Sequence, residues 1–160
     1  MQAEFRHYHY PHTFPLESGA SLPQLDLAYQ TWGQMNSAKD NVIWICHAFT
    51  GSQDVADWWQ GLVGPGKLFN PENNFIVCVN ILGSHYGSTG PLSVNPQTGE
   101  AYYSSFPDIT IRDVVHSFEL LRKELGIKRI KTCIGGSMGG QQAVEWAIIH
   151  PDLIQNLILV

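Results

Sequence analysis

The hydrophobic positions along the chain fall into short, dense runs separated by polar segments. Residues 41–46 and 74–81 are nearly continuous apolar runs, as expected for strands that are covered on both faces of a sheet. The segment between them is long enough for a crossover helix, which we expect around residues 58–63. This arrangement predicts two parallel strands.

More strands are predicted on either side of this pair. Residues 12–16 and 25–32 predict an opening pair joined across residues 17–19, and the second member alternates between apolar and polar residues. Residues 129–134 are rich in β-branched residues, and residues 153–160 form a last apolar run. Both are expected to be buried strands.

Helical spacing of apolar residues marks residues 109–125, where Thr110 and Asp113 fit a capping box and Gly126 suits the end. Residues 138–149 can form another helix, which ends before Pro151. Two strands followed by alternating strands and helices predict an α/β fold, with an open, mostly parallel sheet and flanking helices.

Composition narrows the possible partners. The chain has 160 residues, 44% of them hydrophobic, and a formal net charge of −5, which suits one globular domain and argues against nucleic acid or an anionic membrane as partner. No apolar stretch approaches the roughly 18 residues of a membrane span, and the first residues do not resemble a signal peptide. We therefore expect a cytoplasmic protein.

The cysteines are odd in number and lie in apolar, strand-like runs: Cys46, Cys78 and Cys133. This placement favours buried, reduced thiols over disulfides or metal ligands. No metal site is expected.

Residues 133–142, CIGGSMGGQQ, are the most distinctive stretch for chemistry. Their spacing fits neither a phosphate-binding loop, because Gln141 and Gln142 occupy the lysine and hydroxyl positions, nor a dinucleotide fingerprint, because Ser137 replaces the middle glycine. It does fit G-x-S-x-G, in which a serine lies on a sharp turn between a strand and a helix. The alternative is a glycine-rich turn with an incidental serine.

The predicted sheet brings other loops close to Ser137. In open α/β sheets, reactive groups gather at the carboxyl ends of strands, here residues 46–51 and 82–91. A serine acyl-transfer site builds its oxyanion hole from the backbone N–H after the nucleophile and one from the loop after the third strand. Met138 and Phe49 are the candidate donors.

Several motifs in this order resemble the homoserine O-acetyltransferase family of α/β-hydrolases. They are H-A-x-T-G, G-P-G-K, a long glycine-rich segment, F-P-x-x-T-I-R-D and G-G-S-M-G-G, found at residues 47–51, 64–67, 82–99, 106–113 and 135–140. The chain departs from the family pattern at three positions, where Phe49 replaces leucine, Phe118 replaces glutamine and Gln141 replaces methionine. The last two leave substrate preference open.

The resemblance implies an α/β-hydrolase-type sheet and an acyltransferase of methionine biosynthesis. Ser137 would take an acetyl group from acetyl-CoA, a substrate rather than a bound cofactor, and pass it to the hydroxyl of L-homoserine. The expected partners are an acyl-CoA and a small amino acid, with a homodimer left open. The alternatives are a succinyl-CoA-dependent homoserine or serine O-acyltransferase, an esterase, and a non-enzymatic binding module.

Other residues near these motifs allow two interpretations each. We expect His47 to order the oxyanion loop rather than to act as the base, because it precedes that loop. Trp58 and Trp59 are expected to pack in the core rather than to form a substrate wall. Residues 87–90 are either a turn or part of the pocket lining.

A serine nucleophile in this fold needs an acid and then a histidine later in the chain. After Ser137, His150 and Asp152 stand in the wrong order, and a helix would place His150 roughly 20 Å away. We therefore expect residues 1–160 to be the N-terminal portion of one catalytic domain, truncated after about the sixth strand and inactive alone. The acid, the histidine and the lid would lie beyond residue 160. A catalytically silent binding domain is the alternative, against which the unpaired last strand argues.

Overall fold

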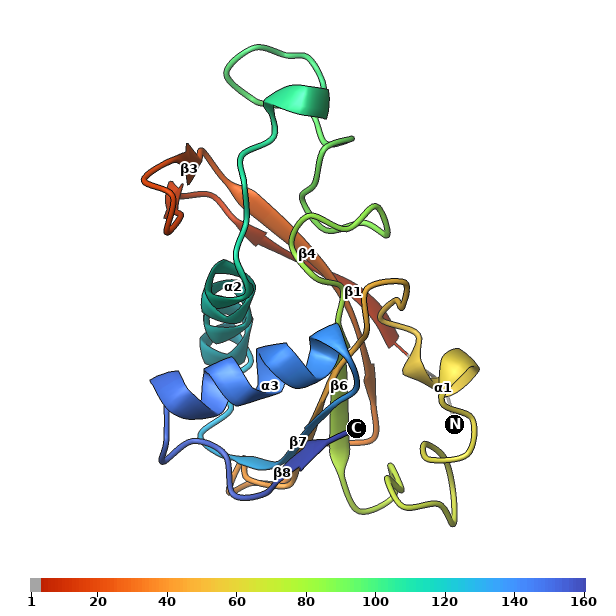
Figure 1. Ribbon diagram of the computed structural model, residues 1–160. Coiled ribbons are helices and arrows are strands. Elements are labelled where there is room, and N and C mark those ends of the chain that lie inside the picture. Colours follow the sequence, from red (N-terminus) through yellow and green to blue (C-terminus); the bar gives the residue numbers. More distant parts are fainter. Residues whose placement is uncertain (1–3) are drawn as a thin grey trace.

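The computed structural model describes residues 4–160, which form a six-stranded sheet with helices on both faces (Figure 1). Its strands lie in the order β1 (Glu4–Tyr10), β4 (Leu25–Trp32), β6 (Phe75–Val79), β5 (Val42–Cys46), β7 (Ile130–Gly135) and β8 (Leu157–Leu159). β5 is parallel to β6 and β7, and β7 is parallel to β8, whereas β4 is antiparallel to both of its neighbours. The predicted α/β class and mostly parallel sheet are confirmed.

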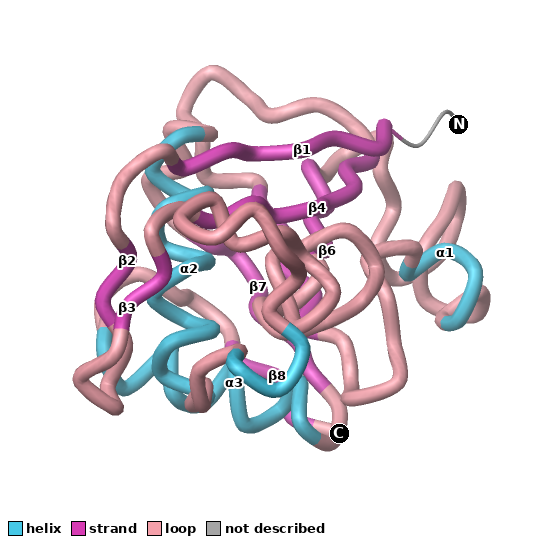
Figure 2. Tube along the Cα trace, turned by 90° about the horizontal axis from the view of Figure 1, so that it is seen from above, coloured by secondary structure: helices cyan, strands magenta, loops and turns pink. Residues whose placement is uncertain are grey.

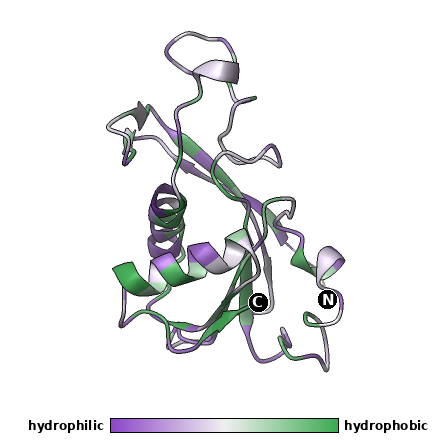
Figure 3. Cartoon of the chain, in the orientation of Figure 1, coloured by the Kyte–Doolittle hydropathy of each residue, from purple (hydrophilic) through white to green (hydrophobic). Residues whose placement is uncertain are grey.

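The central strands are buried because both faces of the sheet are covered. Every residue of β5 is buried, with Val42, Trp44 and Cys46 in one apolar cluster and Ile43 and Ile45 in another. Figure 3 shows hydrophobic residues along these strands. The near-continuous apolar runs of the sequence therefore have the cause that the pattern predicts.

The first cluster lies under α2 (Ile111–Glu124) and α3 (Met138–Ile149), which pack against each other. Thr110 and Asp113 form the predicted capping box, an arrangement that stabilises a helix start by about 1 kcal/mol. Trp146 of α3 donates a hydrogen bond of 2.7 Å to Glu119 of α2 and lies edge-on to Trp44, with ring centroids 4.8 Å apart. These contacts fix α3 on the sheet.

The second cluster is covered by the short helix α1 (Val55–Trp58) and the loop that follows it, on the opposite side of the sheet from α2 and α3 (Figure 2). The expected helix at 58–63 is therefore wrong in position. Residues 59–62 form turns, and the N–H groups of Leu62 and Val63 both donate to Trp59 O. Helix propensity in so short a segment yields to the packing of its apolar side chains.

The opening strands also differ from the prediction. β4 matches the expected strand at 25–32, but its antiparallel partner is β1, and the expected strand at 12–16 is reduced to β2 (Phe14–Pro15), which pairs with β3 (Ser21–Leu22). β1 has the sequence EFRHYHY and is mostly exposed, so it lacks the apolar pattern of a buried strand.

The last strand, β8, is exposed along its whole length, so the expectation of a buried strand there is wrong for the described residues. It pairs on one side with β7. A short 3₁₀ helix, η1 (Tyr103–Ser105), interrupts the long loop between β6 and α2. The helices were also compared with the length and hydropathy of a membrane span. Among residues 4–160, none of the helices is both long and apolar enough to cross a membrane.

The cysteines are buried free thiols, as expected from their apolar surroundings. Cys46 and Cys133 lie on neighbouring strands with their Sγ atoms 3.9 Å apart. This contact, together with burial, raises the pKa of Cys46, and burial also raises the pKa of Cys78. Both thiols therefore stay protonated and behave as core residues.

Candidate active site

Ser137 stands on the sharp turn between β7 and α3 that the G-x-S-x-G pattern predicts. Its backbone has φ 54° and ψ −124°, a conformation that side chains rarely adopt and that stores strain at functional sites. The residue is exposed at the carboxyl end of the parallel strands, and its N–H donates to Val160 O at 3.0 Å. The turn thus presents the hydroxyl to solvent rather than to the core.

The glycines of the turn allow α3 to approach the sheet closely. A Cβ on Gly139 would lie 2.1 Å from Cys46 O of β5, and one on Gly135 would lie 2.1 Å from Gly139 O. No side chain fits at either position without moving backbone. The strained turn is therefore held by direct contact between main chains.

The backbone of Met138 offers a free hydrogen-bond donor. The carbonyl of Ser137, in the same peptide unit, accepts bonds from the N–H groups of Gly140 at 2.9 Å and Gln141 at 3.3 Å. Because C=O and N–H point in opposite directions in a trans peptide, the Met138 N–H faces away from the helix. Within residues 4–160 it has no hydrogen-bond partner.

The loop after β5 presents a second free donor at Phe49. Here the carbonyl of the preceding residue, Ala48, accepts from Gly51 N–H at 2.9 Å, and the Phe49 N–H has no partner in the described part of the chain. The Phe49 side chain is 77% exposed, so its ring contributes little to the core. Two unpartnered N–H groups beside a serine can stabilise a developing oxyanion.

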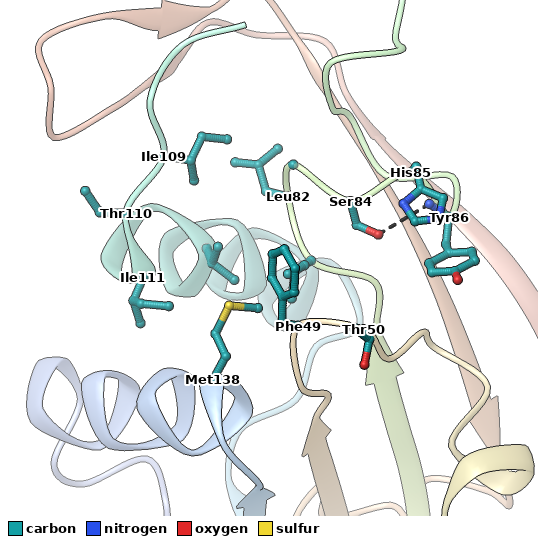
Figure 4. A pocket seen from close by; sticks show the side chains of 13 residues that line it. Phe49, Thr50, Leu82, Ser84, His85, Tyr86, Ile109, Thr110, Ile111 and Met138 are labelled. Atoms are coloured by element: carbon teal, nitrogen blue, oxygen red, sulfur yellow. Dashed lines mark hydrogen bonds between the residues drawn. The ribbon is translucent and has the colours of Figure 1, made fainter.

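Phe49 and Met138 line one cavity of about 450 Å³, where their side chains lie close to each other (Figure 4). The remaining wall comes from the loop after β5, the loop after β6 and the start of α2 with the residues just before it: Thr50, Ile81, Leu82, Gly83, Ser84, His85, Tyr86, Ile109, Thr110, Ile111 and Val114. The lining that residues 4–160 supply is mostly apolar and contains no Lys, Arg, Asp or Glu. It suits a small uncharged group.

Ser137 itself lines a second, more open cavity of about 600 Å³, which shares Ile111 with the first. Its lining includes Val144 and Glu145 of α3 and Val160 after β8. Gln141, one of the departures from the family pattern, also lines it. The serine therefore borders the second cavity, whereas the adjoining Met138 borders the first.

No hydrogen bond joins Ser137 Oγ to a histidine among residues 4–160. His47 is fully buried, and both of its ring nitrogens are engaged elsewhere: Nδ1 lies 2.8 Å from Ala48 O, and Nε2 accepts from Ile81 N–H at 3.2 Å. His150 caps the far end of α3, where it lies 3.7 Å from the Glu119 carboxylate. Neither is placed to take the serine proton.

Other residues singled out in the sequence lie outside the lining of the cavity of Phe49 and Met138. Trp58 and Trp59 pack against the second apolar cluster and do not line the cavity of Phe49 and Met138, which agrees with the packing interpretation. Residues 87–90 do not line it either: Ser88 Oγ and Thr89 Oγ1 accept from backbone N–H groups of β4. Phe118 lies in the aromatic core, where its ring centroid is 5.7 Å from that of Trp44.

The part of the cavity wall that the start of α2 supplies was not predicted from the sequence. Ile109, Ile111 and Val114 face the cavity because the start of α2 lies at the same end of the sheet as the carboxyl ends of the strands. Their helical spacing was a sign of burial only, and nothing in it separates a cavity wall from a core.

A family model described as the alpha/beta hydrolase fold matches residues 41–160. The chain belongs to the α/β-hydrolase fold family. The homoserine O-acetyltransferase of Trichormus variabilis is 52% identical over 157 residues, which is 98% of this chain and 44% of that relative. The chain thus spans less than half of the curated relatives that it matches, and its resemblance to them is confirmed.

Solved structures give the same fold with two different activities in their names. The homoserine O-acetyltransferase of Bacillus anthracis superposes with a TM-score of 0.92 at 32% identity, over 99% of this chain and 47% of that one. Esterase E22 superposes with a TM-score of 0.89 at 33% identity, with the same coverage. The fold alone therefore does not separate transfer from hydrolysis.

Proposed function

We propose that this chain carries the nucleophile and the oxyanion hole of a homoserine O-acetyltransferase. The observation that carries the proposal is the strained Ser137 together with the N–H groups of Phe49 and Met138, which have no partner within residues 4–160 and belong to two residues that line an apolar cavity. The relatives that are about half identical to this chain bear the same name. Such an enzyme acts in methionine biosynthesis, and we place it in the cytoplasm.

In the proposed reaction, Ser137 Oγ attacks the carbonyl carbon of acetyl-CoA and loses its proton to a base. The C–O bond forms, the N–H groups of Phe49 and Met138 stabilise the oxyanion, and the C–S bond then breaks, so that CoA leaves as a thiol. The homoserine hydroxyl next attacks the acetyl-serine in the same way. O-acetylhomoserine leaves and the proton returns to Ser137.

This scheme needs a base that residues 4–160 do not place at Ser137. We therefore propose that an acid and a histidine from elsewhere in the whole enzyme complete the site. In this proposal residues 4–160 supply the attacking atom and the donors, and those two parts can be tested separately from the base.

The lining of the cavity favours acetyl over succinyl as the transferred group. A succinyl group carries a carboxylate, and burying an unpaired carboxylate costs several kcal/mol. Among residues 4–160, no Lys or Arg lines the cavity of Phe49 and Met138 to pair with that charge. The acceptor, homoserine, is proposed from the names of the relatives.

The first test is to replace Ser137 in the whole enzyme. Ser137→Ala should lower turnover on the order of 10⁶-fold, and brief exposure of the wild type to acetyl-CoA should place an acetyl group on Ser137, visible by peptide mass spectrometry. Ser37→Ala, at an exposed position, is the matched control and should leave turnover unchanged. An active Ser137→Ala variant, or an acetyl group on another residue, would contradict the assignment.

A second test separates transfer from hydrolysis, which the similarity to esterase E22 makes the main alternative. CoA release from acetyl-CoA should be much faster with L-homoserine than without it. Equal rates would make the protein an esterase. Binding of acetyl-CoA with no turnover in either mixture would make it a binding module.

A further inference from the structure

The His47 side chain is buried at the point where three elements of the site meet. Its Nδ1 lies 2.8 Å from Ala48 O in the loop after β5, and its Nε2 lies 3.2 Å from the N of Ile81, after β6. Its own carbonyl accepts from Gln142 Nε2 of α3 at 3.3 Å. One residue therefore touches the loop after β5, the segment after β6 and α3.

These contacts define the protonation state of the ring. Ile81 N–H can only donate, so Nε2 must carry a lone pair, and the ring proton lies on Nδ1, where it is donated to Ala48 O. Burial lowers the pKa of His47, which agrees with a neutral ring. The polar groups that contact the ring within residues 4–160 are uncharged: the Ala48 carbonyl, the Ile81 N–H and the Asn80 side chain.

The bond to Ala48 O aims the oxyanion donor at Phe49. Ala48 C=O and Phe49 N–H belong to one planar peptide unit and point in opposite directions. Two donors, His47 Nδ1–H and Gly51 N–H, hold that carbonyl. Holding the oxygen on one side therefore fixes the direction of the N–H on the other.

The bond from Ile81 fixes a second peptide unit in the same way. Asn80 C=O shares its plane with Ile81 N–H and accepts from Ser88 Oγ at 2.6 Å. Ile81 and Leu82, which follow, are walls of the cavity of Phe49 and Met138. The His47 ring thus joins the peptide that donates to the oxyanion with the peptide at which the cavity wall begins.

We propose that His47 is a positioning residue whose ring edges have separate tasks: Nδ1–H aims the Phe49 N–H at the oxyanion, and Nε2 sets the cavity wall at Ile81. The proposal rests on the function proposed above. It also goes beyond an ordering of the loop, because it predicts that the two tasks can be lost one at a time.

Two substitutions in the whole enzyme keep one edge each. Asn places an amide nitrogen near the position of Nδ1, and Gln places an amide oxygen near the position of Nε2. His47→Asn should keep kcat within about 3-fold and raise KM for acetyl-CoA, whereas His47→Gln should keep KM and lower kcat about 10- to 100-fold. The latter loss is smaller than the 10²–10³ found when an oxyanion donor is removed, because Gly51 N–H still holds Ala48 O.

An inhibitor that forms a tetrahedral adduct with serine gives a readout that depends on the oxyanion hole rather than on turnover. Methylboronic acid adds to a serine hydroxyl and places an oxygen at the oxyanion position, so its inhibition constant should rise about 10-fold in His47→Gln and stay unchanged in His47→Asn. His116→Gln, at an exposed position on α2, is the control and should change neither measurement.

The outcomes distinguish a failure of the proposed role of His47 from a failure of the proposed function. A split of kcat and KM between the two variants supports the separate tasks. Equal losses in both variants, in proportion to their loss of stability, would overturn this inference and leave the proposed function standing. A wild-type enzyme that does not acetylate Ser137 would overturn both.

Discussion

The two turns that offer N–H donors to the candidate oxyanion hole are built in different ways. The turn at Ser137 is held by main-chain contact, since Gly139 lies against the backbone of β5 and Gly135 against Gly139. The loop at Phe49 is held by a side chain, that of His47, and by one N–H, that of Gly51. The first turn tolerates almost no added atom, whereas the second depends on particular hydrogen bonds.

This difference predicts that the two turns fail differently. Changes of size should break the turn at Ser137 and lower the free energy of unfolding. Changes of hydrogen-bonding capacity should loosen the loop at Phe49 and lower activity before stability.

The largest effect is expected for Gly139→Ala. Its Cβ would lie 2.1 Å from Cys46 O, a backbone atom of a central strand that cannot move aside, so the free energy of unfolding should fall by about 4 kcal/mol or more. Urea denaturation of the whole enzyme measures it. Gly61→Ala is the control: a Cβ there meets no atom within 4 Å, and its stability should change by less than about 1 kcal/mol. Similar midpoints for the two variants would contradict main-chain packing at the turn.

A smaller loss is expected for Gly51→Ala in the other turn. Its Cβ would lie 2.9 Å from His47 Cβ and 3.2 Å from Ala48 O, contacts that the exposed loop can relieve by shifting. We expect a loss of about 1–2 kcal/mol, together with a fall in kcat because the Ala48 peptide turns. A variant that lost stability but kept full kcat would show that the Phe49 N–H does not depend on this loop geometry.

The pH dependence of stability should reveal the neutral His47. Burial lowers its pKa in the folded state, so its contribution to stability is present above the ordinary histidine pKa of about 6.5 and is lost as the pH falls below that value. Between pH 7 and 5 the free energy of unfolding should therefore fall more steeply in the wild type than in His47→Gln. A His47→Gln slope equal to that of the wild type would mean that His47 is not buried as a neutral ring.

The smallest effect is expected for Phe49→Leu, which restores the residue of the family pattern. The proposed donor is the backbone N–H, which the change leaves in place, and the ring is 77% exposed. We expect kcat within about 3-fold of wild type in steady-state assays, far from the 10²–10³ that losing a donor costs. A 100-fold loss would assign the role to the ring instead.

The sequence predicted best those parts of the fold whose causes are local. β5, β6 and α2 follow from continuous apolar runs, helical spacing and the Thr110–Asp113 cap. β1 was missed because its residues are exposed and its strand conformation comes from pairing with β4. α1 was misplaced because the packing of its loop, rather than helix propensity, decides where the turn lies.

In the candidate site, too, features with local causes could be predicted and features that depend on the alignment of distant strands could not. Ser137 could be predicted because its strand, glycines and helix are contiguous in the sequence. The contact between His47 and Ile81 could not, because it depends on how β5 and β6 align side by side. The cavity wall at the start of α2 could not be predicted either, because the helical spacing of apolar residues is the same whether they face a core or a cavity.

The strand order has a consequence for how the protein is made. β5 lies between β6 and β7, yet both of these neighbours are translated after it, and Trp44 meets its partner Cys133 only roughly 90 residues later. At about 5–20 residues per second, the ribosome takes from about 4 to 18 seconds to supply that partner. During this interval β5, every residue of which is buried in the finished fold, lacks the neighbouring strand on one side, so the nascent chain should be a client for chaperones that bind apolar segments until residues 130–135 emerge.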